Sequence, residues 1–371
     1  MPYGTVNADV IQTSTSGGIL GAGNASIMKN RIINGAMVID QRNAGASVTP
    51  TNTGALTYTL DRWAGYGSVA SKFSVQQNAG SVTPPVGFTN YLGVTSLSAY
   101  SVGSSDLFKV QQSIEGFNVA DLQWGTANAK TVTVSFWVRS SLTGTFGGAL
   151  QNNASNRNYP FTYTISAANT WEQKSVTIAG DTTGTWESTT SAGIQVVWGL
   201  GMGSSFSGTA GAWAAGNIQS ATGATSVVGT SGATFYITGV QLEVGSSATG
   251  YEYRQYTTEL QLCQRYYQLV ADSVGSASAQ LAAGMCLSGT DYFFPLRLSQ
   301  NMRANPTMAL IGTVRYFLGS SSATSSSLTF SNTTTNSTRI QITASGTTGY
   351  GSWLQLEGGS GTDKLTASAE L

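Results

Sequence analysis

The sequence contains no histidine among its 371 residues. Histidine is the usual general base of hydrolases and a common zinc ligand, so its absence excludes Ser–His–Asp catalysis, Cys–His catalysis and histidine-containing zinc motifs. A glycosidase would need only two carboxylates. The 17 acidic residues include Glu115, Asp121, Glu172, Asp181 and Glu187, in or beside the middle region. None stands in a catalytic motif, and most fit turns or strand ends, as Asp181 does in AGDTTG. The sequence therefore predicts a protein that is not an enzyme.

Charged residues are scarce as well, at 9% of the chain against about 25% in an average protein. Lys and Arg balance Asp and Glu at 17 each, and the sequence pI is about 6.3. Without a basic excess there is no electrostatic footprint for nucleic acid or for an anionic membrane. Solubility must come from hydroxyl and amide side chains, a composition that is common on secreted and virion surfaces.

The chain has two cysteines, Cys263 and Cys286, which are too few for a disulfide framework, although a single bond between them stays open. The amino-terminal MPYGTVNADV lacks the basic and apolar segments of a signal peptide. No run approaches the ~20 apolar residues of a membrane-spanning helix. We therefore expect synthesis in the cytoplasm without a secretion signal, and no membrane insertion. A role outside the cell would require release by another route, such as lysis.

The sequence does contain many glycines, 45 in all, and many short segments in which apolar and polar residues alternate. In TVTVSFWVRSS, for example, Val132, Val134, Phe136 and Val138 fall on one face of a predicted strand. Such segments recur between Gly, Asn, Asp and Pro turns, at spacings typical of a sandwich or barrel. We predict an all-β protein.

The length suits two or three domains, and the pattern changes at two places. Residues 1–29 hold one predicted strand, in TVNADVIQTST, and a glycine-rich linker, GGILGAGNAS. This arm has nothing of its own to pair with and is expected to dock on a partner or on its own copies. Residues 30–254 are strand and turn throughout. They begin with RIINGAMVIDQR, which fits a strand buried on both faces or bulged at Gly35. Residues 255–371 form a second β domain that begins with a helix.

That helix is predicted over residues 257–267, TTELQLCQRYY. Leu260, Cys263 and Tyr266 or Tyr267 recur there at helical spacing, and Glu259 lies in the first turn, where the helix dipole favours it. The aromatic and basic segment YEYR precedes the helix. We interpret it as packing at the junction of two β domains rather than as a binding site.

Rare charges in so neutral a chain are usually paired near the core. Asp61 and Arg62 in LDRW and Arg42 in VIDQR are therefore expected to form a partly buried ionic cluster. The alternative is that Asp40 or Asp61 binds a structural Ca²⁺, because strand-end carboxylates supply the oxygen ligands that this ion prefers. No other cofactor is expected.

The tryptophans divide into two groups by their surroundings. Those in strand patterns are expected in the core: Trp63, Trp137, Trp171 and Trp198. A flat ring beside amides and hydroxyls suits a sugar, because the ring can stack on C–H faces while polar groups bind hydroxyls. The glycan-binding candidates on this argument are Trp186, Trp213 and Trp353, with Asn156, Arg157 and Tyr159 of the SNRNYP segment. The alternative is that these rings only cover loops.

Several longer segments carry a resemblance. They are KNRIINGAMVIDQRNAG, YTLDRW, SIEGFNVADLQWGTANAKTVTVSFWVRSSLTGT, TWEQKSVTIAGDTTGTW and YITGVQLEVGSSATGYEYRQYTTELQLCQRYY, within residues 29–268. Together they resemble tail-fibre and related virion structural proteins of tailed bacteriophages, and the last segment is the most specific. FFPLRLSQNMRANPTMAL, residues 293–310, and the ending ASAEL are similar to the carboxy-terminal domain of such proteins. The first residues are similar to their virion-attachment segments.

This resemblance implies a virion-attachment arm at 1–29, a jelly-roll β-sandwich similar to carbohydrate-binding modules at 30–254, and a smaller carboxy-terminal β domain at 255–371. It also implies a homotrimeric virion protein that contacts other virion proteins through residues 1–29 and attaches the particle to polysaccharide on the host cell. The sequence has no long coiled-coil or repetitive shaft. A head fibre or capsid decoration with a purely structural role is therefore the alternative, and a glycan-depolymerising tailspike is the enzymatic one.

Overall fold

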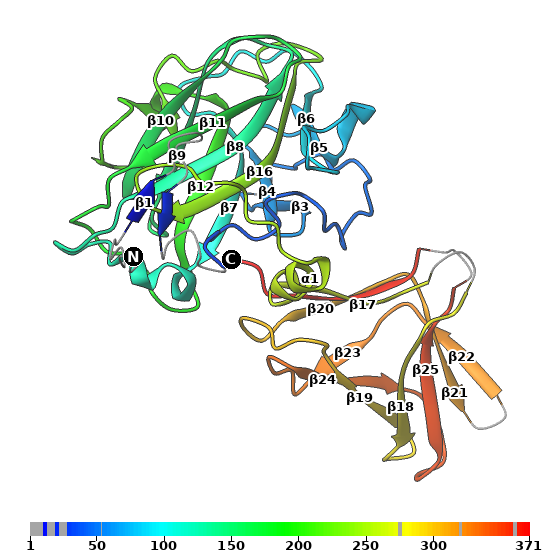
Figure 1. The fold of residues 1–371 in the computed structure, drawn as a ribbon. Coiled ribbons are helices and arrows are strands. Elements are labelled where there is room, and N and C mark those ends of the chain that lie inside the picture. Colours follow the sequence, from blue (N-terminus) through cyan, green and yellow to red (C-terminus); the bar gives the residue numbers. More distant parts are fainter. Residues whose placement is uncertain are drawn as a thin grey trace, which may run out of the picture. The chain divides into compact units, whose positions relative to one another are not determined.

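The computed structural model describes residues 28–52, 54–273, 277–318, 321–358 and 362–371, together with the backbone of β1 (Val10–Gln12) and β2 (Ile19–Gly21) (Figure 1). The chain divides into two compact units, Met1–Gln255 and Tyr256–Leu371. Strands dominate both units, and α1 (Tyr256–Gln264) is the one α-helix in the described ranges, which confirms the all-β prediction. No helix within these ranges is both long enough and apolar enough to cross a membrane.

Most of the arm predicted at residues 1–29 lies outside the described residues. The described part pairs β1 with β2 in antiparallel register, with Val10 opposite Gly21. The strand predicted in TVNADVIQTST therefore has a partner in its own chain, within the stretch predicted to be a linker. A local pairing of this kind closes a short loop, which costs little chain entropy.

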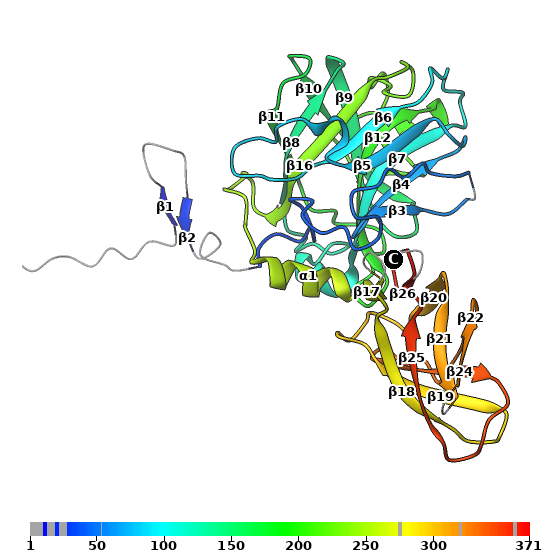
Figure 2. The same cartoon turned by 90° about the vertical axis from the view of Figure 1, so that its right-hand side faces the viewer.

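The first unit is a sandwich of two antiparallel sheets (Figure 1, Figure 2). The larger sheet has the spatial order β14 (Ala214–Ala215), β10 (Arg157–Ile165), β9 (Gly144–Gln151), β12 (Ala192–Met202), β7 (Leu107–Glu115), β4 (Trp63–Gly67) and β3 (Thr57–Leu60). The smaller sheet has the order β11 (Glu172–Ile178), β8 (Val132–Ser140), β16 (Thr234–Val244), β6 (Leu92–Ser96) and β5 (Phe73–Gln77). A short parallel pair, β13 (Ser207–Gly208) and β15 (Ser220–Ala221), lies in the segment between β12 and β16. Single 3₁₀ turns complete the unit: η1 (Ala79–Ser81), η2 (Gly116–Asn118), η3 (Ala120–Leu122) and η4 (Ser204–Phe206).

The core of the sandwich follows the two-residue period of its strands. On β8, Val134, Phe136 and Val138 are fully buried, as their alternation predicts. They face β12 of the other sheet, where the ring of Phe136 meets that of Trp198 edge-on at 5.6 Å. Trp63 lies 5.6 Å from the same indole. Interdigitated inner faces of this kind supply the apolar burial that stabilises a two-sheet sandwich.

Two of the four tryptophans predicted in the core occupy it. Trp63 and Trp198 are fully buried. Trp137 is only partly buried, because it follows Phe136 on β8 and successive side chains of a strand point to opposite faces. Trp171 precedes β11 and is also partly buried, donating its indole N–H to the carbonyl of Thr83 at 2.9 Å. The prediction is wrong for these two residues, since strand membership alone does not fix the face.

The segment RIINGAMVIDQR is not a strand. Residues 31–42 form an irregular path of bends and turns, and both Ile32 and Met37 are fully buried within it. The backbone bonds to β16 at two points, from Arg31 N to Leu242 O at 2.9 Å and from Val240 N to Gly35 O at 3.0 Å. A Cβ on Gly35 would lie 2.2 Å from the Val240 carbonyl oxygen. The glycine thus permits a close backbone approach rather than a bulge.

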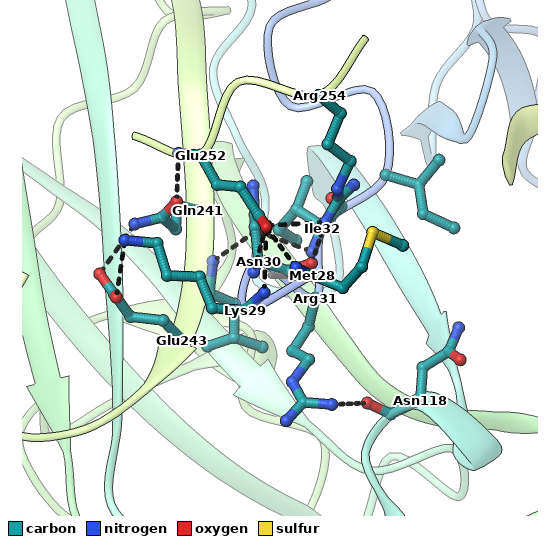
Figure 3. A network of polar contacts seen from close by, with 12 residues as sticks. Met28, Lys29, Asn30, Arg31, Ile32, Asn118, Gln241, Glu243, Glu252 and Arg254 are labelled. Atoms are coloured by element: carbon teal, nitrogen blue, oxygen red, sulfur yellow. Dashed lines mark hydrogen bonds and ion pairs between the residues drawn. The ribbon is translucent and has the colours of Figure 1, made fainter. Parts of the chain in front are cut away.

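The two ends of the sandwich unit are joined by a polar network that we call the terminal clamp: Lys29, Asn30, Gln241, Glu243, Glu252 and Arg254 (Figure 3). The Glu252 carboxylate accepts the backbone N–H of Asn30 at 2.8 Å. The Asn30 side chain accepts the N–H of Leu242 on β16 at 3.1 Å, and Arg254 donates to the Ile32 carbonyl at 3.0 Å. Side chains from both ends of the unit therefore bind each other's backbone, which holds the irregular segment 31–42 in place.

The segment YEYR packs on the sandwich itself. Tyr251 and Tyr253 lie 5.0 Å apart, and both rings meet that of Phe88, at 5.1 and 5.6 Å. Arg254 belongs to the terminal clamp. A contact of these residues with the second unit stays a prediction.

The second unit begins with α1 and contains two sheets. The three-stranded sheet has the order β17 (Tyr267–Asp272), β26 (Lys364–Ser368) and β20 (Thr307–Ile311). The seven-stranded sheet has the order β22 (Ser321–Ser325), β21 (Val314–Leu318), β25 (Gly351–Leu356), β18 (Gln280–Cys286), β19 (Asp291–Arg297), β24 (Ser337–Thr343) and β23 (Thr329–Ser331). The helix ends at Gln264, three residues earlier than predicted, and Tyr267 already belongs to β17. Cys263 and Cys286 are both buried and neither forms a disulfide, so the bond that the sequence left open is not made.

Candidate functional site

The candidate residues drawn from the sequence fall in two places. Asn156, Arg157, Tyr159, Trp186 and Trp213 come together at one edge of the sandwich, around the start of β10. Trp213 is the centre of this group, with the ring of Tyr159 at 5.3 Å and that of Trp186 at 5.4 Å. Trp353 belongs to the second unit and is not part of the group.

The rings of this edge group pack mainly on one another. A further indole, Trp124, meets Trp186 at 4.7 Å and Trp213 at 5.2 Å, in each case edge-to-face. The N–H of Trp213 is donated to the Ala179 carbonyl at 2.8 Å, and the guanidinium of Arg157 lies 5.9 Å from the Trp213 ring centre. Mutual edge-to-face packing stabilises each ring pair by about 0.5–1.5 kcal/mol, so the cluster fastens the surrounding loops.

Asp181 is the electrostatic centre of the edge group. It is 1% exposed, and Arg157 donates to its two oxygens at 2.8 and 2.6 Å. Burial alone would raise the pKa of Asp181, but hydrogen bonds from Arg157 and Thr183 outweigh it and hold that pKa below its usual value. The pKa of Arg157 is raised by the same contact. The sequence context of Asp181 predicts only a turn-forming residue. In the structure it also forms an ion pair with Arg157 that anchors its loop.

Replacing Asp181 with asparagine is expected to lower the free energy of unfolding at pH 7 by about 2 kcal/mol, because a hydrogen bond to a charged group contributes about 1.5–3 kcal/mol. A carboxyl group whose pKa is depressed on folding stabilises the protein above its unfolded pKa of about 3.9, and this contribution is lost as the pH falls through the folded pKa. The gap between wild type and D181N should therefore close below pH 4 in urea titrations. A gap that stays constant from pH 7 to pH 3 would contradict the assignment.

Trp353 forms a separate aromatic pair on β25 of the second unit. The residue is 46% exposed, and its ring stacks on that of Phe317 of β21 at 4.3 Å, with 30° between the planes. One face of this indole is thus covered and part of the side chain faces solvent. Trp353 is therefore an exposed ring of the kind that suits a sugar, and it belongs to the second unit rather than to the sandwich.

A polar groove, which none of the residues predicted from the sequence lines, lies on the outer face of the larger sheet of the sandwich. Strand alternation points Tyr66 of β4, Lys109 and Gln111 of β7, Gln195 of β12 and Gln151 of β9 away from the core. They line a depression of about 210 Å³. Its remaining lining residues are Gly54, Leu56, Leu107 and Ser155. We call this the amide groove.

Strand pairing sets the side chains of the amide groove opposite one another. Tyr66 faces Lys109 across the β4–β7 pair, and Gln151 faces Gln195 across the β9–β12 pair. Tyr66 and Gln195 are half-buried, so a ligand can reach them. Gln219, from the segment between β12 and β16, accepts a hydrogen bond from Lys109 Nζ at 2.7 Å. Side chains of the larger sheet therefore form the base of the groove, and the segment between β12 and β16 contacts the groove through the bond from Lys109 to Gln219.

The amide side chains are only partly satisfied. Gln151 donates to Gln195 Oε1 at 3.0 Å and to Ser155 Oγ at 2.8 Å. Within the described residues, Oε1 of Gln151 and Oε1 of Gln111 are buried and have no hydrogen-bond donor. A buried acceptor without a donor costs about 1–3 kcal/mol. The groove residues Gln111 and Gln151 therefore each keep an amide oxygen that can still accept a hydrogen bond.

Lys109 is the one cation that lines the groove. The residue is only 6% exposed, and its Nζ is 6.0 Å from the ring centre of Tyr66. Burial lowers the pKa of Lys109 to about 7, because removal from water disfavours the charged amine. A signal for this site is present in the sequence: LFKVQQSIE alternates apolar residues with Lys and Gln, but it does not show which strands lie beside it.

The ionic cluster expected of Asp61, Arg62 and Arg42 stays a prediction. The described contacts of Asp61 and Asp40 are hydrogen bonds to their carboxylates. Asp61 is fully buried and accepts from the backbone N–H and the side chain of Gln41, at 2.6 and 2.9 Å. Asp40 accepts the N–H groups of Asn43 and Gly45 at 2.9 and 2.7 Å. Across the described residues no three His, Cys, Asp or Glu side chains gather as a metal site would require. A Ca²⁺ site at Asp40 or Asp61 stays a prediction.

No protein-family model and no curated protein matches the sequence. Among solved structures, a putative sugar binding protein from Bacteroides thetaiotaomicron is 12% identical over 58% of this chain and 100% of its own, with a TM-score of 0.35. A CBM4 structure is 16% identical over 57% of this chain and 98% of its own, with a TM-score of 0.29. The enzymatically active domain of tailspike protein 4 from bacteriophage CBA120 is 11% identical over 58% of this chain, with a TM-score of 0.29, and the match spans 22% of that chain. Likenesses at this level carry no conclusion about function.

Proposed function

We propose that the sandwich unit binds glycans and that the amide groove is the binding site. The observation that carries this proposal is the set of side chains contributed by four adjacent strands: amides at Gln111, Gln151 and Gln195, with a phenol ring at Tyr66. Amide groups can donate to one sugar hydroxyl and accept from another, and an aromatic ring packs against sugar C–H groups. Ligand sites built in this way place a few polar groups within a concave surface on a rigid sheet.

We further propose a biological setting, which rests on the resemblance of residues 29–268 to tail-fibre proteins. In this setting the protein is a virion component, made in the host cytoplasm, that joins other virion proteins through residues 1–29 and self-associates as a homotrimer. Several copies of a weak glycan site then act together on the host surface, since multivalency can raise the overall affinity by 10²–10⁴. The alternative is a head fibre or capsid decoration that binds no receptor.

The proposed role is binding without catalysis. None of the described residues that line the amide groove is Asp or Glu, so a pair of carboxylates for glycoside cleavage has no candidate there. Incubation with host polysaccharide should therefore release no oligosaccharide. Detection of product would favour the depolymerising tailspike.

The proposal predicts that Tyr66→Ala and Gln195→Ala each weaken glycan binding by about tenfold, the effect of losing roughly 1.4 kcal/mol of contact free energy. Both side chains are half-buried, so the fold should survive. The measurement is binding of purified, labelled protein to host cells with and without removal of surface polysaccharide, followed by titration on isolated glycans. The matched control is Gln173→Ala, an exposed amide on β11 of the other sheet.

The same assay separates the candidate sites. Trp213→Ala and Trp353→Ala test the residues drawn from the sequence. If either of these abolishes binding while Tyr66→Ala and Gln195→Ala do not, the amide groove is the wrong site. Binding that is insensitive to stripping of polysaccharide, in a protein that still assembles, would favour the structural alternative.

A further inference from the structure

The amide groove contains a buried amine that no carboxylate neutralises. Among the described residues, Lys109 Nζ donates one hydrogen bond, to Gln219 Oε1 at 2.7 Å, although an ammonium group has three N–H donors. Buried lysines are rare in proteins unless an anion is paired with them. Lys109 takes part in none of the described ion pairs of the sandwich. The basic residues of those pairs are Lys29, Arg31, Lys130, Arg157, Lys174 and Arg254.

The described side chains that line the groove beside Lys109 are uncharged. Tyr66 faces it from β4, and the other polar side chains of the groove are Gln111, Gln151, Gln195 and Ser155. From the segment between β12 and β16 it meets the amide of Gln219. Tyr66 is thus the one other titratable side chain of the groove lining. An anion that entered the groove would meet a cation and amide dipoles, and no competing negative charge.

We propose that the amide groove selects acidic glycans, with the anionic substituent of one sugar unit, such as a carboxylate, bound at Lys109 Nζ. This inference rests on the proposed glycan-binding function and adds the class of sugar. The amides of Gln111, Gln151 and Gln195 bind the neutral hydroxyls, while Lys109 supplies the charge that discriminates between sugars. A charge-assisted hydrogen bond is roughly twice as strong as a neutral one, and it gains further from the low dielectric of a buried site.

The burial of Lys109 makes anion binding by its amine depend on pH. Nζ lies 6.0 Å from the ring centre of Tyr66 and 2.7 Å from Gln219 Oε1, and burial lowers the pKa of Lys109 to about 7. An anion at Nζ would favour the charged form and raise this pKa. Binding of an acidic glycan should therefore take up a proton near neutral pH, and affinity should increase as the pH is lowered through 7, because the amine is the group that becomes charged.

The test uses the full chain and matched pairs of glycans: oligogalacturonate and a hyaluronan fragment, each beside its carboxyl-reduced form, and dextran sulfate beside dextran. Wild-type protein should bind at least one acidic member tenfold or more tightly than its neutral counterpart. Lys109→Met and Lys109→Gln should remove this preference. Lys72→Met is the control, since Lys72 Nζ lies 4.8 Å over the ring of Tyr100, outside the groove lining. Thermal unfolding of each variant verifies the fold.

Titration of the wild-type protein between pH 8.5 and pH 6 provides a readout without any substitution. Affinity for the acidic glycan should rise roughly tenfold over this range, and affinity for the neutral form should stay constant. Preference for a sulfate but not a carboxylate would support anion selection and identify a sulfated glycan as the ligand.

Two outcomes separate the acidic-glycan inference from the proposed function. If neutral glycans bind as tightly as acidic ones, or if Lys109→Met keeps the preference, the inference is overturned and glycan binding by the groove stands. If a broad panel of acidic and neutral glycans shows no binding at all, the proposed function is overturned and the inference with it.

Discussion

Replacing Glu252 with alanine is expected to lower the free energy of unfolding of the sandwich unit by about 3–5 kcal/mol, the usual cost of removing one partner from a buried charged pair. The Glu252 carboxylate accepts the backbone N–H groups of Met28, Lys29 and Asn30, and it lies 3.4 Å from the guanidinium of Arg254 (Figure 3). The Arg254 side chain is only 5% exposed. Without Glu252, its charge and the N–H groups lose their shared acceptor.

The reason for so large an effect is that Glu252 joins segments at opposite ends of the unit. Residues 28–30 begin the described part of the sandwich, and Glu252 lies close to its last residue, Gln255. When the carboxylate is lost, the irregular segment that follows residue 30 loses one of its fixed points. Ile32 and Met37 in that segment are fully buried and would then be held less firmly in the core.

Calorimetry of the E252A variant measures this effect. The transition of the sandwich unit should shift down by about 6–20 °C, at about 2–4 °C per kcal/mol for a unit of this size. Glu187→Ala is the matched control, because Glu187 is exposed and its removal should shift the transition by less than about 2 °C. A shift for E252A that is no larger than that for E187A would show that the terminal clamp does not stabilise the unit.

Replacing Trp198 with alanine is the second large-effect prediction, with an expected loss of about 3–5 kcal/mol. The indole is fully buried at the centre of the sandwich, where the rings of Trp63 and Phe136 each lie 5.6 Å away. Its removal leaves a cavity between two rigid sheets, and neither sheet can move to fill it without breaking its strand pairing. Transfer free energy and lost packing therefore add together.

The measurement is urea unfolding followed by near-ultraviolet circular dichroism. Trp137→Ala is the matched control: it removes the same side chain from a partly exposed position on β8, and it should cost less than half as much. Equal losses for the two variants would contradict the assignment of Trp198 to the core and of Trp137 to the outer face.

Local patterns of the sequence determined the class of fold. The alternation of Val134, Phe136 and Val138 predicts a half-buried strand, and the structure places these residues on the inner face of β8. The helical spacing in TTELQLCQRYY predicts α1 within a few residues of its bounds. Signals of this kind survive because a strand or a helix repeats its geometry along the chain, so that neighbouring residues report on the same face.

Five of the candidate residues chosen from the sequence lie close to one another in the structure, although nothing in the sequence indicates that they should. Arg157 and Tyr159 stand in one short segment, but Trp186 and Trp213 join them only because β10 lies beside β14 and because Asp181 anchors the intervening loop. Their polar groups are mostly bonded to Asp181 and to backbone carbonyls of the surrounding loops. Composition around a residue indicates a loop, and it does not tell whether the ring in that loop packs inward or binds a ligand.

The tertiary structure alone decided where the groove lies. Lys109 and Gln111 alternate with core residues on β7, which any sandwich strand can do, but their meeting with Tyr66, Gln151 and Gln195 requires the strand order β9–β12–β7–β4. That order depends on pairings between segments far apart in the chain, and side-chain periodicity carries no information about them. The sequence by itself thus determined that this protein is built of strands without histidine chemistry. Long-range strand pairing decided which polar side chains share one face, and with them the site.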